Sequence, residues 1–368
     1  MFVNYDECIL NYIASIRDYY GLDSSYAKRE DFSNYLKSLD INKIFLVLID
    51  GMGSRLIERK LDENSFLRRN LFHETSTVFP STTTAATTSI LNGKSPNENA
   101  WLGWTQYFKE KDDIIIPFLG KGLKNDYDEN IVKELVEVDD MIHELNQKGI
   151  KAHEIYPAFR ENGCKDFNEV CSRMIDESFN NQDPFTYVYW DAYDSKMHKL
   201  GVNNEESDNY LKEINDLLED ASNKLNEKTL MIIIADHGQV DIEKEINIYE
   251  TSLNKYLIRP TTIEPRATAF FVKEEYKELF AKEFKESYAD EFILLSHDEV
   301  IKTHLFGDHE NHPKFEGFIG DFLAIAKDHT HFVYNDKPKD FKFKGSHAGC
   351  HIDELMIPVI TYYKDFAK

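Results

Sequence analysis

Three short apolar runs, each followed at once by acidic or imidazole side chains, constrain this chain more than any other feature. The runs are Lys43–Ile49, Phe185–Trp190 and Leu230–Ala235. Each run is continuously apolar rather than alternating, which is typical of strands in a parallel sheet whose two faces are both covered by helices. The sequence therefore favours an α/β fold with a doubly wound, mostly parallel sheet flanked by helices.

Amphipathic helices are predicted between and before these strands. One runs from Val132 to Leu145, a second from Leu211 to Leu225, and a third occupies the N-terminus from Cys8 to Tyr20. Their apolar residues recur three or four positions apart, which is the spacing of one helical face. A final apolar run, Met356–Tyr362, is expected to return to the main sheet.

The stretch from residue 246 to residue 340 has a different pattern. It combines a predicted strand at Ala267–Val272, a charged helix at Lys273–Lys285 and a loop rich in histidine. We predict that residues 246–340 form a smaller inserted α+β cap, and that residues 1–245 and 341–368 form the main catalytic core.

The polar residues that follow the strands predict a metal centre. Asp50 follows the first run, and Asp236 and His237 follow the third. Asp191, Asp194 and His198 follow the second; Asp191 competes with Asp194, but only Asp194 is four residues from His198. Ligands of open α/β sheets bind at the carboxyl ends of the strands, so these side chains can converge. Each group alone has an ordinary interpretation as a turn, a polar loop or a helical pair four residues apart. Together they favour a divalent cation, and mixed Asp and His ligands suit zinc or a similar ion.

A hydroxyl-rich segment, 79–88, lies between a predicted strand at Thr75–Phe79 and a helix that passes through Ile90. Serine and threonine at a helix start are ordinary caps, which accounts for one hydroxyl but not for a run of them. The functional interpretation is a nucleophile at the helix start, where backbone N–H groups can face a phosphate.

Charge and composition exclude several classes of protein. The formal net charge of −23 disfavours nucleic-acid polymers and anionic membranes as partners. No apolar run approaches the ~20 residues that cross a bilayer, and the N-terminus lacks the pattern of a signal peptide. We expect a cytoplasmic protein with reduced, mostly packed thiols at Cys8, Cys164, Cys171 and Cys350.

The chain resembles the alkaline phosphatase superfamily, and most closely its nucleotide pyrophosphatase/phosphodiesterase branch. The resemblance extends from about Lys43 to Tyr363 and rests on the order and spacing of five motifs. These motifs are Asp50-Gly51, then Phe79-Pro80 and Thr83 with Gly93 ten residues later, Asp194 with His198, Asp236-His237-Gly238, and His347-Ala348-Gly349 followed by Asp353-Glu354 and Ile357-Pro358.

The resemblance implies an alkaline-phosphatase-like core with two divalent metal ions, zinc in the first place and manganese as the other candidate. One ion would be held by Asp50, Asp236, His237 and the Thr83 oxygen, and the other by Asp194, His198 and His347. Thr83 would be the nucleophile and form a phosphothreonine intermediate. The Thr84 N–H would contact the phosphate, and His351 is a rival to His347.

The chain departs from this branch at two places. The phosphate-contacting asparagine that many members carry after the nucleophile helix is missing, and the segment 101–104 stands there instead. Its Trp101 and Trp104 could stack on an organic arm of the substrate, although packing in the core is the competing interpretation. Ala348 replaces the first glycine of the usual His-Gly-Gly.

These observations predict a hydrolase of phosphodiesters or nucleotide pyrophosphates that acts on small substrates. No Arg or Lys lies between Phe79 and Asn92 to neutralise a dianionic monoester. A phosphomonoesterase of the same superfamily and a non-catalytic metal-binding protein stay open as alternatives. The oligomeric state is left open as well.

Overall fold

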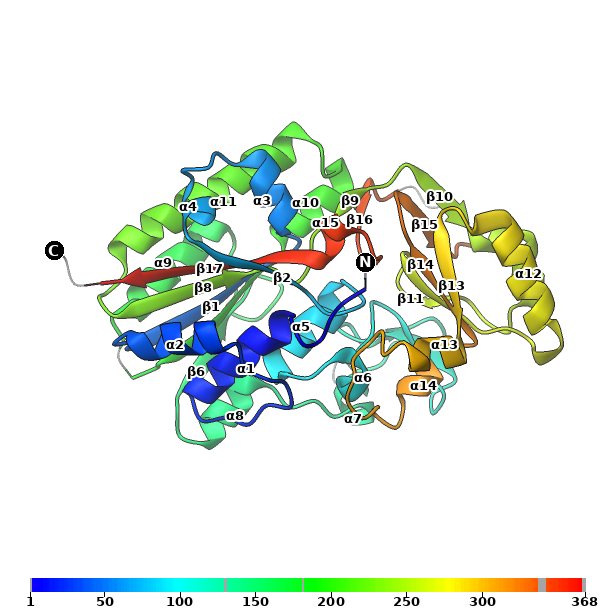
Figure 1. The fold of residues 1–368 in the computed structure, drawn as a ribbon, viewed down its shortest axis with the longest axis horizontal. Helices are drawn as coiled ribbons and strands as arrows, with labels where there is room; N and C mark the ends of the chain where they lie inside the picture. The colour runs from blue at the N-terminus through cyan, green and yellow to red at the C-terminus, as the bar shows by residue number, and fades with distance from the viewer. Residues whose placement is uncertain (1, 129–130, 181, 337–341, 366–368) are drawn as a thin grey trace.

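A six-stranded sheet forms the centre of the chain (Figure 1). The computed structural model describes residues 2–128, 131–180, 182–336 and 342–365. The strand order is β2-β17-β8-β1-β7-β6, and β17 runs antiparallel to both of its neighbours while β8, β1, β7 and β6 are parallel. The strands are β1 (Lys43–Ile49), β2 (Leu71–Ser76), β6 (Ala152–Ile155), β7 (Phe185–Trp190), β8 (Thr229–Ile234) and β17 (Met356–Lys364).

Helices cover both faces of this sheet, as Figure 1 shows. All residues of β1, β7 and β8 are buried, which explains their continuously apolar sequences. The predicted doubly wound, mostly parallel architecture is therefore confirmed. One face is covered by α3 (Ser54–Lys60), α4 (Phe66–Arg69), α9 (Phe167–Ser178), α10 (Ala192–Leu200) and α11 (Glu205–Lys224), and the other by α1 (Ile9–Tyr19), α2 (Glu30–Ser38), α5 (Thr83–Asn92) and α8 (Met141–Gln147).

A second, antiparallel sheet lies beside the first, on the right of Figure 1. Its order is β11-β12-β14-β13, and α12 (Lys277–Tyr288) packs on it through a cluster of phenylalanine rings. The strands are β11 (Thr262–Ile263), β12 (Ala267–Phe270), β13 (Phe292–Ser296) and β14 (Phe322–Ala326), with β10 (Lys244–Asn247) and β15 (Thr330–Val333) paired nearby and β9 (Val240–Asp241) paired with β16 (Gly345–Ser346).

The second sheet shares an apolar cluster with residues 100–136, a segment that we assigned to the catalytic core. Within that segment, β3 (Gln106–Phe108), β4 (Asp113–Ile116) and β5 (Lys121–Gly122) form a small sheet of their own. The division into core and cap stays a prediction. Its boundary at residues 340 and 341 lies outside the described residues.

Several predicted elements differ from the structure. The strand predicted at Ala267–Val272 ends at Phe270, and the helix predicted at Lys273–Lys285 corresponds to α12, which begins at Lys277 and ends at Tyr288. The single helix from Val132 to Leu145 is wrong, because two helices, α7 (Ile131–Leu135) and α8, stand there. Asp140 begins the second one by accepting the His143 N–H at 2.8 Å, and an N-cap of this kind starts a new helix. The strand predicted at Thr75–Phe79 begins and ends earlier, because β2 pairs with β17 only as far as Ser76.

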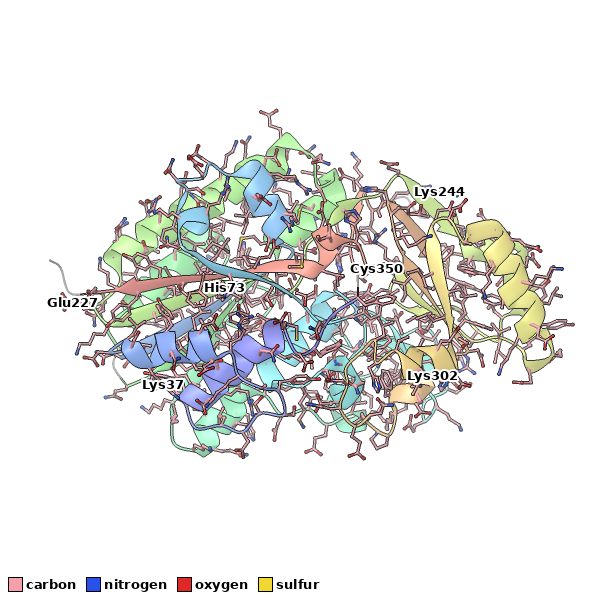
Figure 2. The ribbon with its side chains drawn as sticks, viewed as in Figure 1. Lys37, His73, Glu227, Lys244, Lys302 and Cys350 are labelled. Atoms are coloured by element: carbon pink, nitrogen blue, oxygen red, sulfur yellow. The ribbon has the colours of Figure 1, made fainter. Side chains whose placement is uncertain are left out.

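The cysteine side chains are all buried in the apolar clusters. Cys350, labelled in Figure 2, lies where the second sheet meets the main one, and its Sγ donates to the Ala326 carbonyl at 3.3 Å. No helix among the described residues is long and apolar enough to cross a membrane.

Candidate metal centre

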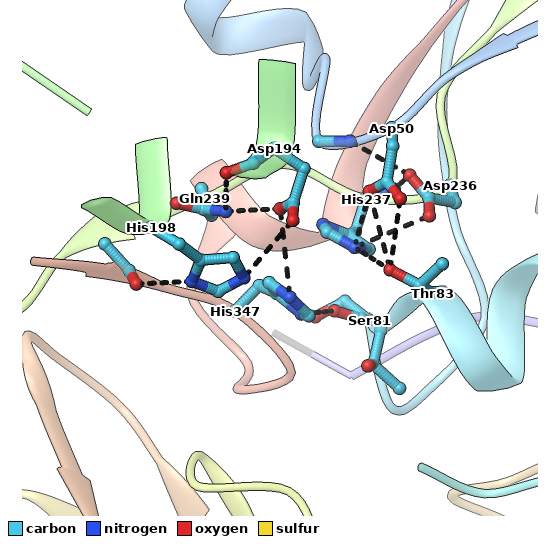
Figure 3. A network of polar contacts seen from close by, with 12 residues as sticks. Asp50, Ser81, Thr83, Asp194, His198, Asp236, His237, Gln239 and His347 are labelled. Atoms are coloured by element: carbon cyan, nitrogen blue, oxygen red, sulfur yellow. Dashed lines mark hydrogen bonds and ion pairs between the residues drawn. The ribbon is translucent and has the colours of Figure 1, made fainter. Parts of the chain in front are cut away.

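The polar residues predicted from the sequence converge at one edge of the main sheet. β8, β1 and β7 are neighbours, so the segments that follow their carboxyl ends lie side by side. Asp50 follows β1, Asp236 and His237 follow β8, and α10 after β7 carries Asp194 and His198. Figure 3 shows these side chains pointing toward one another.

One group of ligand atoms surrounds His237. Its Nε2 atom lies 3.4 Å from Asp50 Oδ1 and 3.5 Å from Asp236 Oδ2. The Thr83 Oγ1 atom is 3.1 Å from the same Nε2 and 3.4 Å from each oxygen of Asp50. Asp50, Asp236 and His237 each offer an atom within 4.8 Å of the other two, which is close enough to hold one ion.

A second group surrounds Asp194. Its Oδ2 atom lies 3.3 Å from the Nε2 atom of His198, one turn along α10, and its Oδ1 atom lies 3.9 Å from the Nε2 atom of His347. Asp194, His237 and His347 form the other compact set of ligand atoms. The His237 and His347 rings are stacked with centroids 3.7 Å apart. His237 therefore lies between the two groups and makes them one continuous centre.

The structure separates the two histidines of the last motif. His347 is turned into the centre, whereas His351 occupies the N-cap position of α15 (Ile352–Leu355). There its Nδ1 atom accepts the Asp353 N–H at 3.2 Å. The ring of His351 is thus used in capping a helix, and His347 is the one placed beside Asp194.

Glycines allow the close backbone approaches on which this convergence depends. Gly51 has φ +72°, and a Cβ atom there would lie 3.0 Å from the Asp194 Cβ. Its N–H donates to Asp236 Oδ1 at 3.1 Å and so fixes that carboxylate. A Cβ atom on Gly238 would lie 2.0 Å from the Asp353 carbonyl oxygen. The glycines of the Asp-Gly and Asp-His-Gly motifs are therefore needed for space as well as for turning the chain.

The three histidines all present Nε2 to the centre, because backbone carbonyls occupy their Nδ1 atoms. Nδ1 lies 2.7 Å from a carbonyl oxygen in His198, 2.9 Å in His237 and 3.1 Å in His347. A carbonyl oxygen can only accept, so each Nδ1 must carry the proton. The neutral ring then has its lone pair on Nε2. This arrangement orients histidines as metal ligands in many proteins.

Three carboxylates buried together create a strongly negative centre. Burial, together with the nearby charges of Asp236 and Asp194, raises the pKa of Asp50 well above its usual value. Burial likewise raises the pKa of Asp236. Asp194 differs: burial alone would raise its pKa, but the neighbouring His198 holds it well below the ordinary value. Cations are the ordinary way to stabilise such a cluster.

Two details test whether the donor set fits metal ions. The Oδ2 atom of Asp236 is fully buried and makes no hydrogen bond within the described chain, so it is free to accept a cation. Burial, followed by the effect of His237, lowers the pKa of His347 well below its usual value, which keeps that ring neutral. Neutral imidazole and ionised carboxylate are the forms that bind divalent metals. The residues present therefore fit two such ions.

The hydroxyl-rich segment 79–88 brings Thr83 to this centre. Thr83 is the first residue of α5, and Thr82 occupies the N-cap position without making a side-chain cap. The Thr82 hydroxyl instead donates to Glu264 Oε1 at 2.6 Å. Burial raises the pKa of Glu264 to about 7, although the bonds from Thr82 and from the Trp104 N–H act in the opposite direction.

The two tryptophans predicted as substrate contacts have different environments. Trp101 is buried and packs in the apolar cluster next to Phe118, at a ring distance of 5.6 Å. The packing interpretation therefore describes Trp101. Trp104 is 44% exposed, and its backbone N–H, not its indole, donates to Glu264 Oε1 at 2.7 Å. Of these two tryptophans, only Trp104 has a ring that is exposed to a substrate.

Sequence reasoning missed three residues that contact the centre or the nucleophile segment. Gln239 donates through Nε2 to Asp194 Oδ1, and the Tyr189 hydroxyl donates to Asp50 Oδ2. Gln239 directly follows the Asp-His-Gly motif and Tyr189 lies one residue before the end of β7, so their positions carried a usable signal. The position of Glu264 in the sequence carried no such signal, because Glu264 comes close to Thr82 only where the second sheet folds back.

The central sheet and its flanking helices have the architecture of an alkaline-phosphatase-like core. The chain belongs to the type I phosphodiesterase / nucleotide pyrophosphatase family, whose model matches residues 138–349, more than half of the sequence. It is thereby a phosphoester hydrolase of a metal-dependent family. A comparison with curated protein sequences found no match.

Solved structures with the same fold include human ectonucleotide pyrophosphatase/phosphodiesterase 5, at 16% identity and a TM-score of 0.67 over 89% of each chain. The murine protein, as an inactive threonine-to-alanine form in complex with AMP, has 14% identity and a TM-score of 0.66 over 89% of this chain and 90% of that one. Phosphonoacetate hydrolase from Sinorhizobium meliloti 1021 in complex with phosphonoacetate has 12% identity and a TM-score of 0.65 over 88% and 90%.

Proposed function

We propose that this chain is a two-metal phosphodiesterase or nucleotide pyrophosphatase that uses Thr83 as its nucleophile. The observation that carries the proposal is the position of the Thr83 hydroxyl, 3.1 Å from His237 Nε2 and 3.4 Å from both oxygens of Asp50. Zinc is the first candidate ion and manganese the second. Asp50, Asp236, His237 and Thr83 would hold one ion, and Asp194, His198 and His347 the other.

Bound divalent ions would act as Lewis acids that lower the pKa of the Thr83 hydroxyl and offset negative charge on the phosphate. The Thr83 oxygen then attacks phosphorus, and the bond from phosphorus to the leaving oxygen breaks. The product of this step is a phosphothreonine that still carries the second organic group. Attack by water on the same phosphorus releases the monoester and restores Thr83.

The start of α5 supplies hydrogen-bond donors for the reacting phosphate. Within the described chain, the Ala86 N–H donates to the Thr82 carbonyl at 2.9 Å, whereas the N–H groups of Thr84 and Ala85 donate to no backbone carbonyl. N–H groups at a helix start point along the positive end of the helix dipole and bind anions. We propose that these two donate to the nonbridging oxygens as charge develops in the transition state.

The charges around Thr83 favour a diester over a monoester. The reacting phosphate of a diester carries one negative charge, whereas a monoester carries about two near neutral pH. The ligand set already contains three carboxylates, and Glu264 adds a fourth carboxyl group beside Thr82. Since no Arg or Lys lies between Phe79 and Asn92, a second phosphate charge would lack a cationic partner from this segment.

The structural neighbours support a small substrate. One of them was solved with AMP and another with phosphonoacetate, and both molecules join a phosphorus oxyanion to an organic group. We further propose that residues 246–340 act as a cap over the centre and influence substrate choice. The bond from Thr82 to Glu264 supports this role, because it places the second sheet against the nucleophile segment.

The proposal is tested by comparing kcat/KM for matched bis-aryl and mono-aryl phosphates, with zinc, manganese or magnesium at saturation. We expect the diester to be preferred and Thr83→Ala to abolish turnover while retaining its metals. A monoester preference of tenfold, about 1.4 kcal/mol in transition-state stabilisation, would assign a phosphatase instead. A chain that binds two metals and hydrolyses neither ester would be a metal-binding protein.

A further inference from the structure

Glu264, in the turn between β11 and β12, is a side chain through which the second sheet reaches the nucleophile segment. It is only 8% exposed. Its Oε1 atom accepts the Thr82 hydroxyl at 2.6 Å and the Trp104 N–H at 2.7 Å. Both distances are those of charge-assisted hydrogen bonds. Three segments that are far apart in the sequence therefore meet at one carboxylate oxygen.

The backbone on both sides of Glu264 is held in place. Its N–H donates to the Ala267 carbonyl at 3.0 Å, and its carbonyl accepts the Thr268 hydroxyl at 2.7 Å. The preceding residue, Ile263, has φ +73°, which a β-branched residue rarely adopts. Two hydrogen bonds with the Thr105 backbone, of 2.8 Å and 3.2 Å, stabilise it there. Such conformations persist only where the surroundings impose them.

The hydrogen bond to Glu264 changes what Thr82 does as the N-cap residue of α5. A threonine at this position ordinarily accepts a hydrogen bond from the second or third N–H of its helix, which here belong to Thr84 and Ala85. Thr82 makes no such bond, and its hydroxyl oxygen lies 2.6 Å from Glu264 Oε1, to which it donates. The two N–H groups that we assign to the phosphate are therefore not capped by their own helix.

We propose that Glu264 is a positioning residue that keeps the start of α5 open to the substrate phosphate by holding the Thr82 hydroxyl away from it. This inference rests on the proposed function, because it assigns the Thr84 and Ala85 N–H groups to the reacting phosphate. Without Glu264, the Thr82 hydroxyl turns back, caps α5 and competes with the phosphate. The role requires an acceptor oxygen at the Oε1 position, which a glutamine amide can also supply.

The test uses inorganic phosphate as the probe on the zinc-loaded chain. Isothermal titration calorimetry measures phosphate binding to the wild type, to Glu264→Ala, to Glu264→Gln and to the double variant Glu264→Ala with Thr82→Val. Glu275→Ala serves as the matched control, because Glu275 is an exposed glutamate of the same segment, residues 246–340. The kcat and KM for a bis-aryl phosphate, the metal content and the Tm are measured on the same samples.

We expect Glu264→Ala to weaken phosphate binding and to lower kcat, each about tenfold, since a capping hydrogen bond competes at that scale. In Glu264→Gln, the phosphate affinity and kcat should each fall by less than about threefold. The double variant should regain most of the phosphate affinity, because valine cannot cap the helix. If the role of Glu264 were merely structural, the Tm and the metal content would fall in Glu264→Ala and fall further in the double variant. The phosphate affinity would then not be regained.

Each other result has a defined meaning. If the wild type hydrolyses diesters and Glu264→Ala binds phosphate equally well, the inference alone fails. It also fails if the double variant binds more weakly than Glu264→Ala, or if glutamine is as harmful as alanine. If the zinc-loaded wild type binds no phosphate, the proposed function fails and the inference fails with it.

Discussion

The Nδ1 atom of His347 lies 3.1 Å from the carbonyl oxygen of Ser81, which is 266 positions away in the sequence and two residues before Thr83. The Ser81 hydroxyl in turn donates to the Gly349 carbonyl at 3.3 Å. Two hydrogen bonds therefore join the last motif of the chain to the nucleophile segment. The orientation of His347, a proposed metal ligand, and the position of Thr83, the proposed nucleophile, therefore depend on each other.

Substitutions of the two histidines of the last motif, His347 and His351, should have different effects on metal binding. His347→Ala removes an Nε2 ligand and the bond to Ser81, so we expect loss of one bound metal and of turnover. His351→Ala removes the cap of α15 and a ring contact with His329, at a cost of about 1 kcal/mol in unfolding free energy, but no ligand of the centre. Elemental analysis and chemical denaturation measure both effects. A metal loss in His351→Ala with none in His347→Ala would reverse the assignment.

Asp50→Asn should have opposite effects on the metal-free and metal-loaded chains. In the metal-free chain the buried Asp50 carboxylate is destabilised by burial and by its acidic neighbours, so its removal should raise the unfolding free energy by roughly 1 kcal/mol. Zinc at 100 times its Kd should stabilise the wild type by about 2.7 kcal/mol and the variant much less. Thermal denaturation in chelator and in zinc measures this inversion. A variant less stable in both conditions would contradict a metal-driven centre.

Gln239 should affect metal affinity without touching the metal. Its Nε2 donates to the Asp194 carboxylate, and a partner that orients a ligand changes metal affinity by about 10- to 100-fold when it is removed. We expect this loss for Gln239→Met in a competitive chelator titration. Gln147→Met, on the exposed side of α8, is the control and should bind zinc as the wild type does. Unchanged affinity in Gln239→Met would show that Asp194 needs no such support.

Glu354 should be needed for stability. Its carboxylate forms a fully buried pair with Arg266 of the second sheet, at 2.6 Å and 2.8 Å, and also accepts the Gly349 and His351 N–H groups. Glu354→Ala leaves the guanidinium buried without its partner, which costs about 3–5 kcal/mol. Urea denaturation measures this loss. A loss below about 1 kcal/mol would mean that water or a neighbour replaces the pair.

The parts of the fold that follow from local pattern were predictable. β1 and β7 match their predicted runs residue for residue, because a strand buried on both faces is apolar throughout. The break between α7 and α8 was not predicted, because the apolar spacing continues across it while Asp140 starts a new helix.

The same distinction holds for the site. The convergence of Asp50, Asp194 and Asp236 follows from the rule that parallel strands expose their carboxyl ends together. The proximity of Glu264 to Thr82 depends on the second sheet folding back and on the left-handed backbone of Ile263. Neither leaves a periodic trace in the sequence, so only the structure reveals this contact.

The central claim is that the phosphoryl group passes through Thr83, and the stereochemical course at phosphorus tests it most directly. The measurement uses a chiral phosphorothioate diester hydrolysed in isotopically labelled water by the metal-loaded chain. Two successive displacements, first by Thr83 and then by water, each invert the configuration, so the account predicts net retention. Net inversion would show that water attacks the substrate directly, and would contradict a covalent intermediate on Thr83.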